Sequence, residues 1–156
     1  VATATATTFV RGEGGFGGPS RPTREPQVIP ERDPDHIVDL KTSPNAALIY
    51  RLSGDYNPLH ADPSIARAAG FPRPILHGLC SFGVAGRAIL QACCKNDPHR
   101  LAELEVRFSS PVYPGENIRT EVWNEGDAIA FRCGVPERQV IALSNGRATI
   151  RPAPSP

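Results

Sequence analysis

The 156-residue sequence contains no methionine, no cysteine pair spaced for a metal or redox centre, and no long hydrophobic run. No stretch approaches the roughly 18 consecutive apolar residues of a transmembrane helix, so we expect no membrane span. The formal net charge is only +1, so no strong positive field attracts nucleic acid. Because a chain without methionine starts at its own initiator only if that residue is removed, we expect a piece of a longer protein.

The four cysteines follow no regular spacing and form no Cys-x-x-Cys pair. They are Cys80, Cys93, Cys94 and Cys133. A structural zinc site needs clustered ligands, and His60, His77 and Cys80 do not form a recognised set. We therefore interpret the cysteines as small buried side chains in a reducing compartment, and we predict no metal site.

What the chain does contain divides it into an extended N-terminal part and a globular remainder. Residues 3–10 are rich in threonine and predict a strand. Glycines and then prolines dominate residues 12–35, and this composition predicts a turn followed by an extended linker. We therefore expect residues 1–35 to be a strand remnant and linker, 36–150 to be one domain, and 151–156 to be a disordered tail.

Helix signals come first in the globular part. Ser43-Pro44 predicts a helix start, with Gly54 as its end, and Asp62-Pro63 predicts a short helix that ends at Gly70. Residues 75–86 carry no Asp, Glu, Lys or Arg, and small apolar residues continue to about residue 93. This composition predicts a helix from about 77 to 93 that is buried on most sides and long enough to cross a sheet.

The second half of the globular part has the signals of strands. They are predicted at 36–40, 102–108, 118–123, 129–135 and 140–150, with a hairpin turn at 124–127. One buried helix, followed by strands that can wrap around it, predicts an α+β fold with an antiparallel sheet.

The segment from Tyr50 to His60 places a carboxylate, an amide and an imidazole within six residues. Asp55 and His60 can together move the two protons of a hydration, because one proton leaves water and one reaches carbon. Asn57 can fix the water or Asp55 by hydrogen bonding. An alternative stays open, in which Asp55 and Asn57 only cap the turn through their side chains.

This segment resembles the signature of the MaoC-like, type 2 (R)-specific enoyl-CoA hydratases. The resemblance continues through Pro74–Cys80, Arg107-Phe108 and Pro111–Gly115. It is closest to the C-terminal half of the two-hot-dog hydratases, such as the hydratase part of peroxisomal multifunctional β-oxidation enzymes. The resemblance implies a hot-dog fold, in which an antiparallel sheet wraps around a long central helix.

The resemblance also implies a reaction, the hydration of trans-2-enoyl-CoA to (3R)-3-hydroxyacyl-CoA, with no cofactor besides the CoA thioester substrate. It implies Asp55 and His60 as the catalytic pair and Asn57 as their support. The backbone N–H of Gly78, at a helix N-terminus, would bind the thioester carbonyl oxygen. The other residues implied to contact substrate are Tyr56, Pro58, Leu59, His77 and Phe108. For His77 a second role stays open, as a neutral imidazole at the helix start that bonds to the loop.

The same resemblance implies a partner, either a first hot-dog half or a second copy in a homodimer. Two other functions stay open: a hot-dog acyl-CoA thioesterase, and a non-catalytic acyl-CoA-binding half that needs a partner. The thioesterase is disfavoured because residues 77–90 carry no carboxylate. The chain ends in Ala-Pro-Ser-Pro and not in a Ser-Lys-Leu-type address. We therefore expect a cytoplasmic protein, with a peroxisomal one as the alternative.

Overall fold

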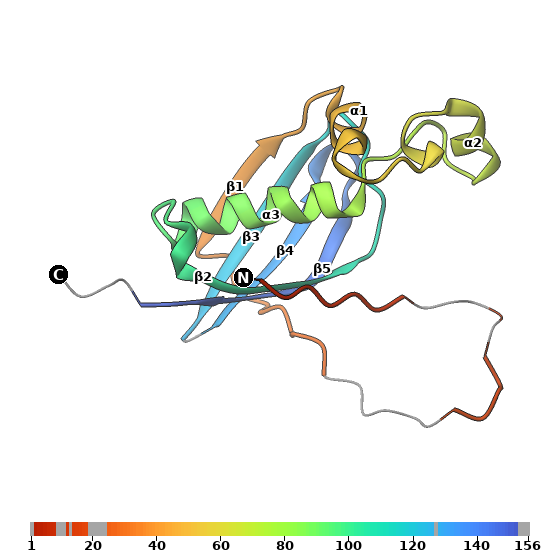
Figure 1. Ribbon diagram of the computed structural model, residues 1–156. Helices are drawn as coiled ribbons and strands as arrows, with labels where there is room; N and C mark the ends of the chain where they lie inside the picture. Colours follow the sequence, from red (N-terminus) through yellow and green to blue (C-terminus); the bar gives the residue numbers. More distant parts are fainter. Residues whose placement is uncertain (1, 9–11, 13, 19–24, 127, 153–156) are drawn as a thin grey trace.

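The computed structural model describes residues 2–8, 12, 14–18, 25–126 and 128–152. A five-stranded antiparallel sheet and one long helix form its centre (Figure 1). The main elements in chain order are β1 (His36–Lys41), α1 (Ala46–Tyr50), α2 (Pro63–Ala68), α3 (Gly78–Cys93), β2 (Leu101–Phe108), β3 (Asn117–Glu125), β4 (Ala128–Val135) and β5 (Val140–Ile150). The sheet order is β1-β3-β4-β5-β2, so β1 and β2 form its edges.

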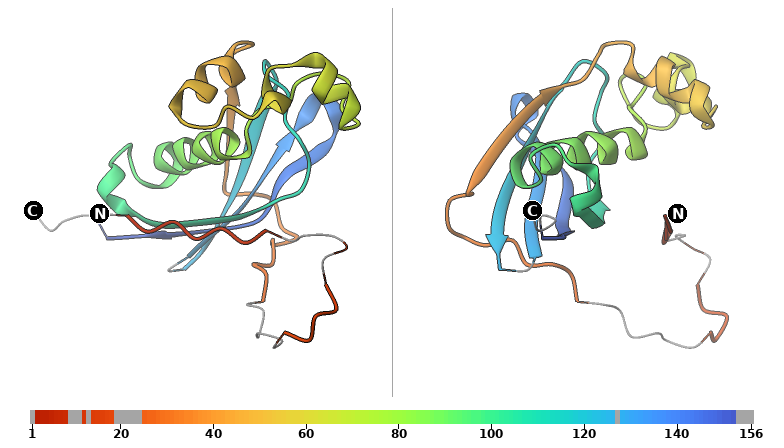
Figure 2. Two further views of the ribbon diagram at one scale, coloured as in Figure 1. Left: turned by 45° about the vertical axis from the view of Figure 1, so that its right-hand side comes forward. Right: turned by 60° about the vertical axis from the view of Figure 1, so that its left-hand side comes forward.

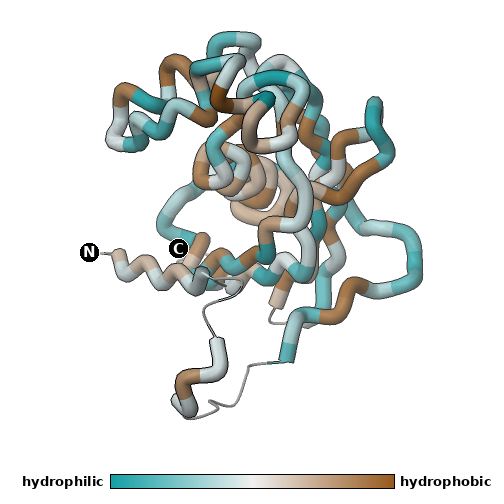
Figure 3. Tube along the Cα trace, turned by 90° about the vertical axis from the view of Figure 1, so that its right-hand side faces the viewer, coloured by the Kyte–Doolittle hydropathy of each residue, from teal (hydrophilic) through white to brown (hydrophobic). Residues whose placement is uncertain are grey.

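The core lies between α3 and the sheet, which curves around the helix (Figure 2). Ala85 and Ile89 of α3 are buried with Ile118 of β3 and Phe131 of β4. Small helix residues allow close approach, since a Cβ on Gly86 would lie 3.3 Å from the Leu104 side chain. Figure 3 looks along α3 and shows its coil largely in the colours of apolar residues. Burial of this apolar surface is the main force that holds the helix on the sheet.

One stripe of α3 remains exposed within the described residues. Leu79, Gly83 and Arg87 follow one another at a spacing of four, which places them on one helix face. The helix is thus buried on most sides, as predicted, and this one face is the exception. The sheet covers the opposite side of the helix, where Ser81, Ala85 and Ala88 are buried.

The predicted strands of the sheet all form, with ends that differ by at most two residues. The first helix starts later than predicted. Ser43 Oγ accepts the N–H of Asn45 at 3.2 Å, and α1 begins only at Ala46. The strand predicted over 3–10 is absent from residues 2–8, which are exposed and have no partner strand among the described residues. The last two residues of that predicted strand lie outside the described ranges.

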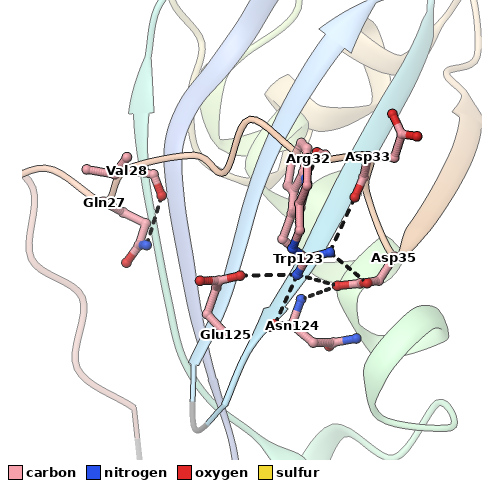
Figure 4. Close-up of polar contacts among 8 residues, drawn as sticks. All are labelled: Gln27, Val28, Arg32, Asp33, Asp35, Trp123, Asn124 and Glu125. Carbon is pink, nitrogen blue, oxygen red and sulfur yellow. Dashed lines mark hydrogen bonds and ion pairs between the residues drawn. The ribbon is translucent and has the colours of Figure 1, made fainter.

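Residues 25–35 pack against the outer face of the sheet, where they bond to residues of β3 and β5, although the sequence predicts a linker there. We call them the strap. The buried Trp123 donates its indole N–H to the carbonyl of Arg32 at 2.8 Å (Figure 4). The Arg32 guanidinium binds both carboxylate oxygens of Asp35, at 2.8 and 2.9 Å. Farther along the strap, Asn145 donates to the carbonyl of Gln27 at 2.9 Å.

All four cysteines are free thiols, and each is buried or partly buried, as the sequence predicts. Burial raises the pKa of Cys133 to about 12, so this side chain stays a neutral thiol. None of the helices in the described ranges is long and apolar enough to cross a membrane.

Candidate active site

The loop between α1 and α2 carries Asp55, Asn57 and His60. Gly54 turns the chain into this loop with a φ of 131°, which side chains rarely adopt. The Asp55 carboxylate accepts the N–H of Asn57 at 3.1 Å, and Asn57 Oδ1 accepts the N–H of Leu59 at 3.0 Å. Both side chains thus cap the turn, as the alternative interpretation predicts. The cap engages one Asp55 oxygen, so capping does not prevent Asp55 from acting in proton transfer.

His60 ends the short 3-10 turn Pro58–His60, and only 8% of its surface is exposed. Its Nδ1 lies 2.8 Å from the carbonyl oxygen of Ile75. A carbonyl oxygen can only accept, so Nδ1 is the protonated nitrogen of the neutral ring. The lone pair of the neutral ring is therefore on Nε2, which is the atom that can take a proton from water.

His77 lies against His60 and is only 1% exposed. The two imidazoles are stacked, with centroids 3.7 Å apart and planes 25° apart. His77 Nε2 lies 3.1 Å from the carbonyl oxygen of Asp55. Burial lowers the pKa of His77, and the hydrogen bond to Asp55 only partly opposes this. The geometry agrees with a neutral, loop-bonded histidine, and its burial directs the ring to the loop and not to the surface.

One carboxylate oxygen of Asp55 and one ring nitrogen each of His60 and His77 lie within 4.8 Å of one another. Three such groups are enough to consider a metal ion. However, the lone pairs of stacked imidazoles lie in nearly parallel planes and do not converge well on one ion. This geometry does not favour a metal ion at the cluster.

The N-terminus of α3 faces the same region. Gly78 is exposed and is the first residue of the helix, where N–H groups lack intrahelical acceptors. A Cβ on Gly78 would lie 3.1 Å from the ring of Phe108, so glycine keeps this approach open. His60, Gly78 and Phe108 line one cavity of about 280 Å³. A ligand in this cavity can therefore meet the imidazole and the positive end of the helix together.

The remaining predicted residues lie at the periphery of this cluster. Tyr56 is exposed, and the Arg51 guanidinium lies 5.7 Å from its ring centroid. Pro58 and Leu59 form the 3-10 turn that presents His60. The sequence analysis missed Ile75 and also Ser81, a buried residue that lines the cavity. Ile75 acts through its backbone and has no sequence signal, whereas Ser81 lies one helical turn after Gly78 and could have been found by that spacing.

A second cavity, of about 290 Å³, lies on the outer face of the sheet. Its lining includes Arg119 and Arg132, which are paired with Asp39 and Glu121 respectively. These ion pairs occupy the charged groups of the cavity, and none of the predicted site residues lines it.

A family model described as "MaoC like domain" matches residues 25–145. The chain belongs to the MaoC-like domain family. It is 47% identical over 147 residues to the mouse "Peroxisomal multifunctional enzyme type 2", a match that covers 93% of this chain and 20% of the mouse protein. It is 45% identical over 147 residues to the Arabidopsis thaliana "Enoyl-CoA hydratase 2, peroxisomal", covering 88% of this chain and 48% of that protein.

Among solved structures, a MaoC-like dehydratase from Phytophthora capsici superposes with a TM-score of 0.87 and 46% identity. That match covers 92% of this chain and 51% of the other. The sheet and α3 of this MaoC-like domain therefore form a hot-dog fold, as predicted. The chain spans about half the length of the plant hydratase and a fifth of the mouse enzyme.

Proposed function

We propose that this MaoC-like domain is the catalytic unit of an (R)-specific 2-enoyl-CoA hydratase. The observation that carries the proposal is the meeting of Asp55, His60 and the N-terminus of α3 beside one cavity. The plant relative is named an enoyl-CoA hydratase, which supports the same reaction class. We propose a place for this reaction in β-oxidation.

The proposed reaction adds water across the C2–C3 double bond of a trans-2-enoyl-CoA and gives (3R)-3-hydroxyacyl-CoA. The Gly78 N–H and the α3 dipole stabilise negative charge on the thioester oxygen as the hydroxyl forms its bond to C3. Asp55 and His60 hold the water between them. One takes its proton and the other delivers a proton to C2, so hydrogen and charge balance. Asn57 supports this pair by fixing the turn that carries it.

No redox cofactor enters this proposal, because hydration leaves the electron count of the substrate unchanged. The proposal also uses no metal, because it assigns proton transfer to Asp55 and His60 and the carbonyl oxygen to the amide donor of Gly78. Tyr56 and Phe108 are proposed to line the path of the acyl-CoA, since both are exposed and Phe108 also lines the cavity.

A second hot-dog unit is proposed to complete the site, either a first half of the same protein or a second copy. The chain spans about half of the plant relative. Large apolar side chains on α1, on the segment that follows it, on α3 and on β2 are exposed, namely Leu48, Ile49, Leu52, Tyr56, Leu79 and Phe108. Exposure of several large apolar side chains favours an interaction surface. Because both relatives carry "peroxisomal" in their names, we favour the peroxisome over the cytoplasm as the location.

The test is a hydration assay with trans-2-enoyl-CoA and chiral analysis of the product. We expect (3R)-3-hydroxyacyl-CoA from the chain alone or after a second hot-dog half is added. A (3S) product would refute the proposal. Release of free CoA from a saturated acyl-CoA would instead identify a thioesterase, and tight acyl-CoA binding with no turnover in either assembly would identify a non-catalytic half.

A further inference from the structure

His77 joins two parts of the site that are distant in sequence. It is the N-cap residue of α3, directly before Gly78, yet its side chain makes no cap hydrogen bond to the helix. Its Nε2 instead reaches the backbone carbonyl of Asp55, 22 residues earlier, at 3.1 Å. One residue therefore connects the loop of the catalytic carboxylate to the helix end that carries the amide donor.

The hydrogen bond selects one form of the His77 ring. The Asp55 carbonyl can only accept, so His77 Nε2 must carry a proton. His77 Nδ1 is buried and has no hydrogen-bond partner, so a proton there would be a buried, unpaired donor. A charged ring would also lie against His60 and near Arg51, which disfavour a second positive charge, although Asp55 favours one. The neutral Nε2–H tautomer is the form that fits these surroundings.

The face of the same ring supports His60. His60 is held at one edge by the bond from Nδ1 to Ile75, and this bond alone still permits the ring to tilt. His77 stacks on the face of His60 at 3.7 Å, and the Tyr50 ring lies 4.7 Å from His77 at 42°. The edge bond and the stacked face together fix the direction of His60 Nε2.

We propose that His77 is a positioning residue for the hydration: its Nε2–H holds the backbone of Asp55, and its ring face holds the imidazole of His60. The two catalytic side chains thereby keep one geometry relative to the Gly78 amide. This inference rests on the proposed hydratase function. It assigns His77 no contact with substrate, in keeping with its burial.

Three variants separate the two contacts. His77→Gln keeps an N–H near the position of Nε2 but removes the ring face. His77→Phe keeps a ring but removes the donor, and His77→Asn removes both, because its shorter amide lies near the position of Nδ1. His99→Asn is the matched control, since His99 is exposed and belongs to the 3-10 turn beyond the other end of α3.

We expect kcat to fall about 100-fold in His77→Asn, since a misplacement of about 1 Å costs that much. The Gln and Phe variants should lose less, about 10-fold each, while KM stays within about twofold in all three. Melting curves by circular dichroism show whether each variant is folded at the assay temperature. A folded His77→Asn variant with wild-type kcat would overturn the proposal, and so would equal losses in all three variants that follow the fraction unfolded.

A second measurement does not depend on activity. Long-range ¹H–¹⁵N NMR spectra of the wild-type protein report which nitrogen of each imidazole carries the proton. We expect the Nε2–H tautomer for His77 and, for the neutral ring of His60, the Nδ1–H tautomer. An Nδ1–H form of His77, with no proton on Nε2, would overturn the proposed contact with Asp55 even if the enzyme is a hydratase. If the protein hydrates no enoyl-CoA, the proposed function fails, and these spectra alone then decide whether the His77–Asp55 contact exists.

Discussion

Asp55 combines a local structural task with the proton transfer that we propose for it, and this overlap decides how the site can be tested. Its Oδ1 accepts the N–H of Asn57, which closes the turn that leads to His60. An asparagine oxygen can accept the same bond, but an amide cannot take or give a proton as a carboxylate does. Similarly, an asparagine at 60 can keep the donor to Ile75 while it removes the base.

We therefore expect Asp55→Asn and His60→Asn each to lower hydratase turnover by about 10²–10⁴-fold while melting temperatures stay close to the wild type. The control is Asp97→Asn, because Asp97 caps the 3-10 turn Pro98–Arg100 by the same bond, to His99 N–H at 3.0 Å, beyond the far end of α3. Wild-type turnover in either site variant would remove that residue from the catalytic pair.

Gly78 differs from the other exposed glycine of α3 in what a methyl group would meet. A Cβ at Gly78 lies 3.1 Å from the Phe108 ring, whereas a Cβ at Gly83 meets nothing within 4 Å. Phe108 is 53% exposed, so its ring can move aside and the fold survives Gly78→Ala. The methyl group then occupies the space beside the amide donor.

We expect Gly78→Ala to lower kcat at least tenfold without loss of stability. Gly83→Ala should keep kcat and raise the free energy of unfolding by about 0.5–1 kcal/mol, because alanine is the better helix former. Enzyme kinetics and chemical denaturation measure the two effects. Equal kcat values for both variants would show that the thioester oxygen does not bind at Gly78.

The residues of the site differ in how visible they are in the sequence. Asp55, Asn57 and His60 are found because three polar side chains stand within six residues between Gly54 and the following helix. The role of the Ile75 carbonyl cannot be predicted from the sequence, because every residue has a carbonyl and only the fold shows which one contacts His60. The stacking of His77 on His60 is also a tertiary fact, because it depends on how the loop folds back on α3.

At the scale of elements, the predictions succeed where side chains decide the structure. β2 alternates apolar and charged residues, and α3 lacks charge over its first nine positions, so both are evident from the sequence. The strap is not predicted, because backbone carbonyls hold it to the sheet. The carbonyl of Gln27 accepts from Asn145, and the carbonyl of Arg32 accepts from Trp123. The prolines and charged residues of the strap give it the composition of a linker, although the segment packs against the sheet.

The strap is therefore expected to be part of the folded unit. Trp123 is the single tryptophan of the chain and is 1% exposed, so its fluorescence reports on the strap. Removing residues 1–24 should leave the emission unchanged. Removing residues 1–35 should shift the emission to longer wavelength and lower the free energy of unfolding by about 2 kcal/mol, the scale for exposing one large apolar side chain. If both truncations unfold at the same denaturant concentration, the strap contributes nothing to stability.

At the scale of the whole molecule, the outer face of the sheet and the face that carries the site differ in how much apolar surface they expose. The outer face of the sheet is covered partly by the strap and partly by ion pairs such as Arg119 with Asp39. The site face instead exposes Leu52, Leu79 and Phe108, and α3 shows a bare stripe there. The sequence could not predict this contrast, because a run of small apolar residues does not tell which side of the helix the sheet covers.

If a second hot-dog unit covers the site face, a charge on that face should block association and a charge on the outer face should not. Leu79 is 62% exposed beside Gly78, whereas Ile141 is 38% exposed on the outer face of the sheet. We expect Leu79→Asp to weaken association at least tenfold, because burying a leucine contributes about 1.5–3 kcal/mol and burying a charge opposes it. Ile141→Asp should leave association unchanged. Sedimentation of the 16.7 kDa chain, alone and with an added first half, measures the association of both variants.

A wild-type chain that stays monomeric and hydrates enoyl-CoA at full rate would show that one hot-dog unit is sufficient, and the exposed apolar face would then need another explanation.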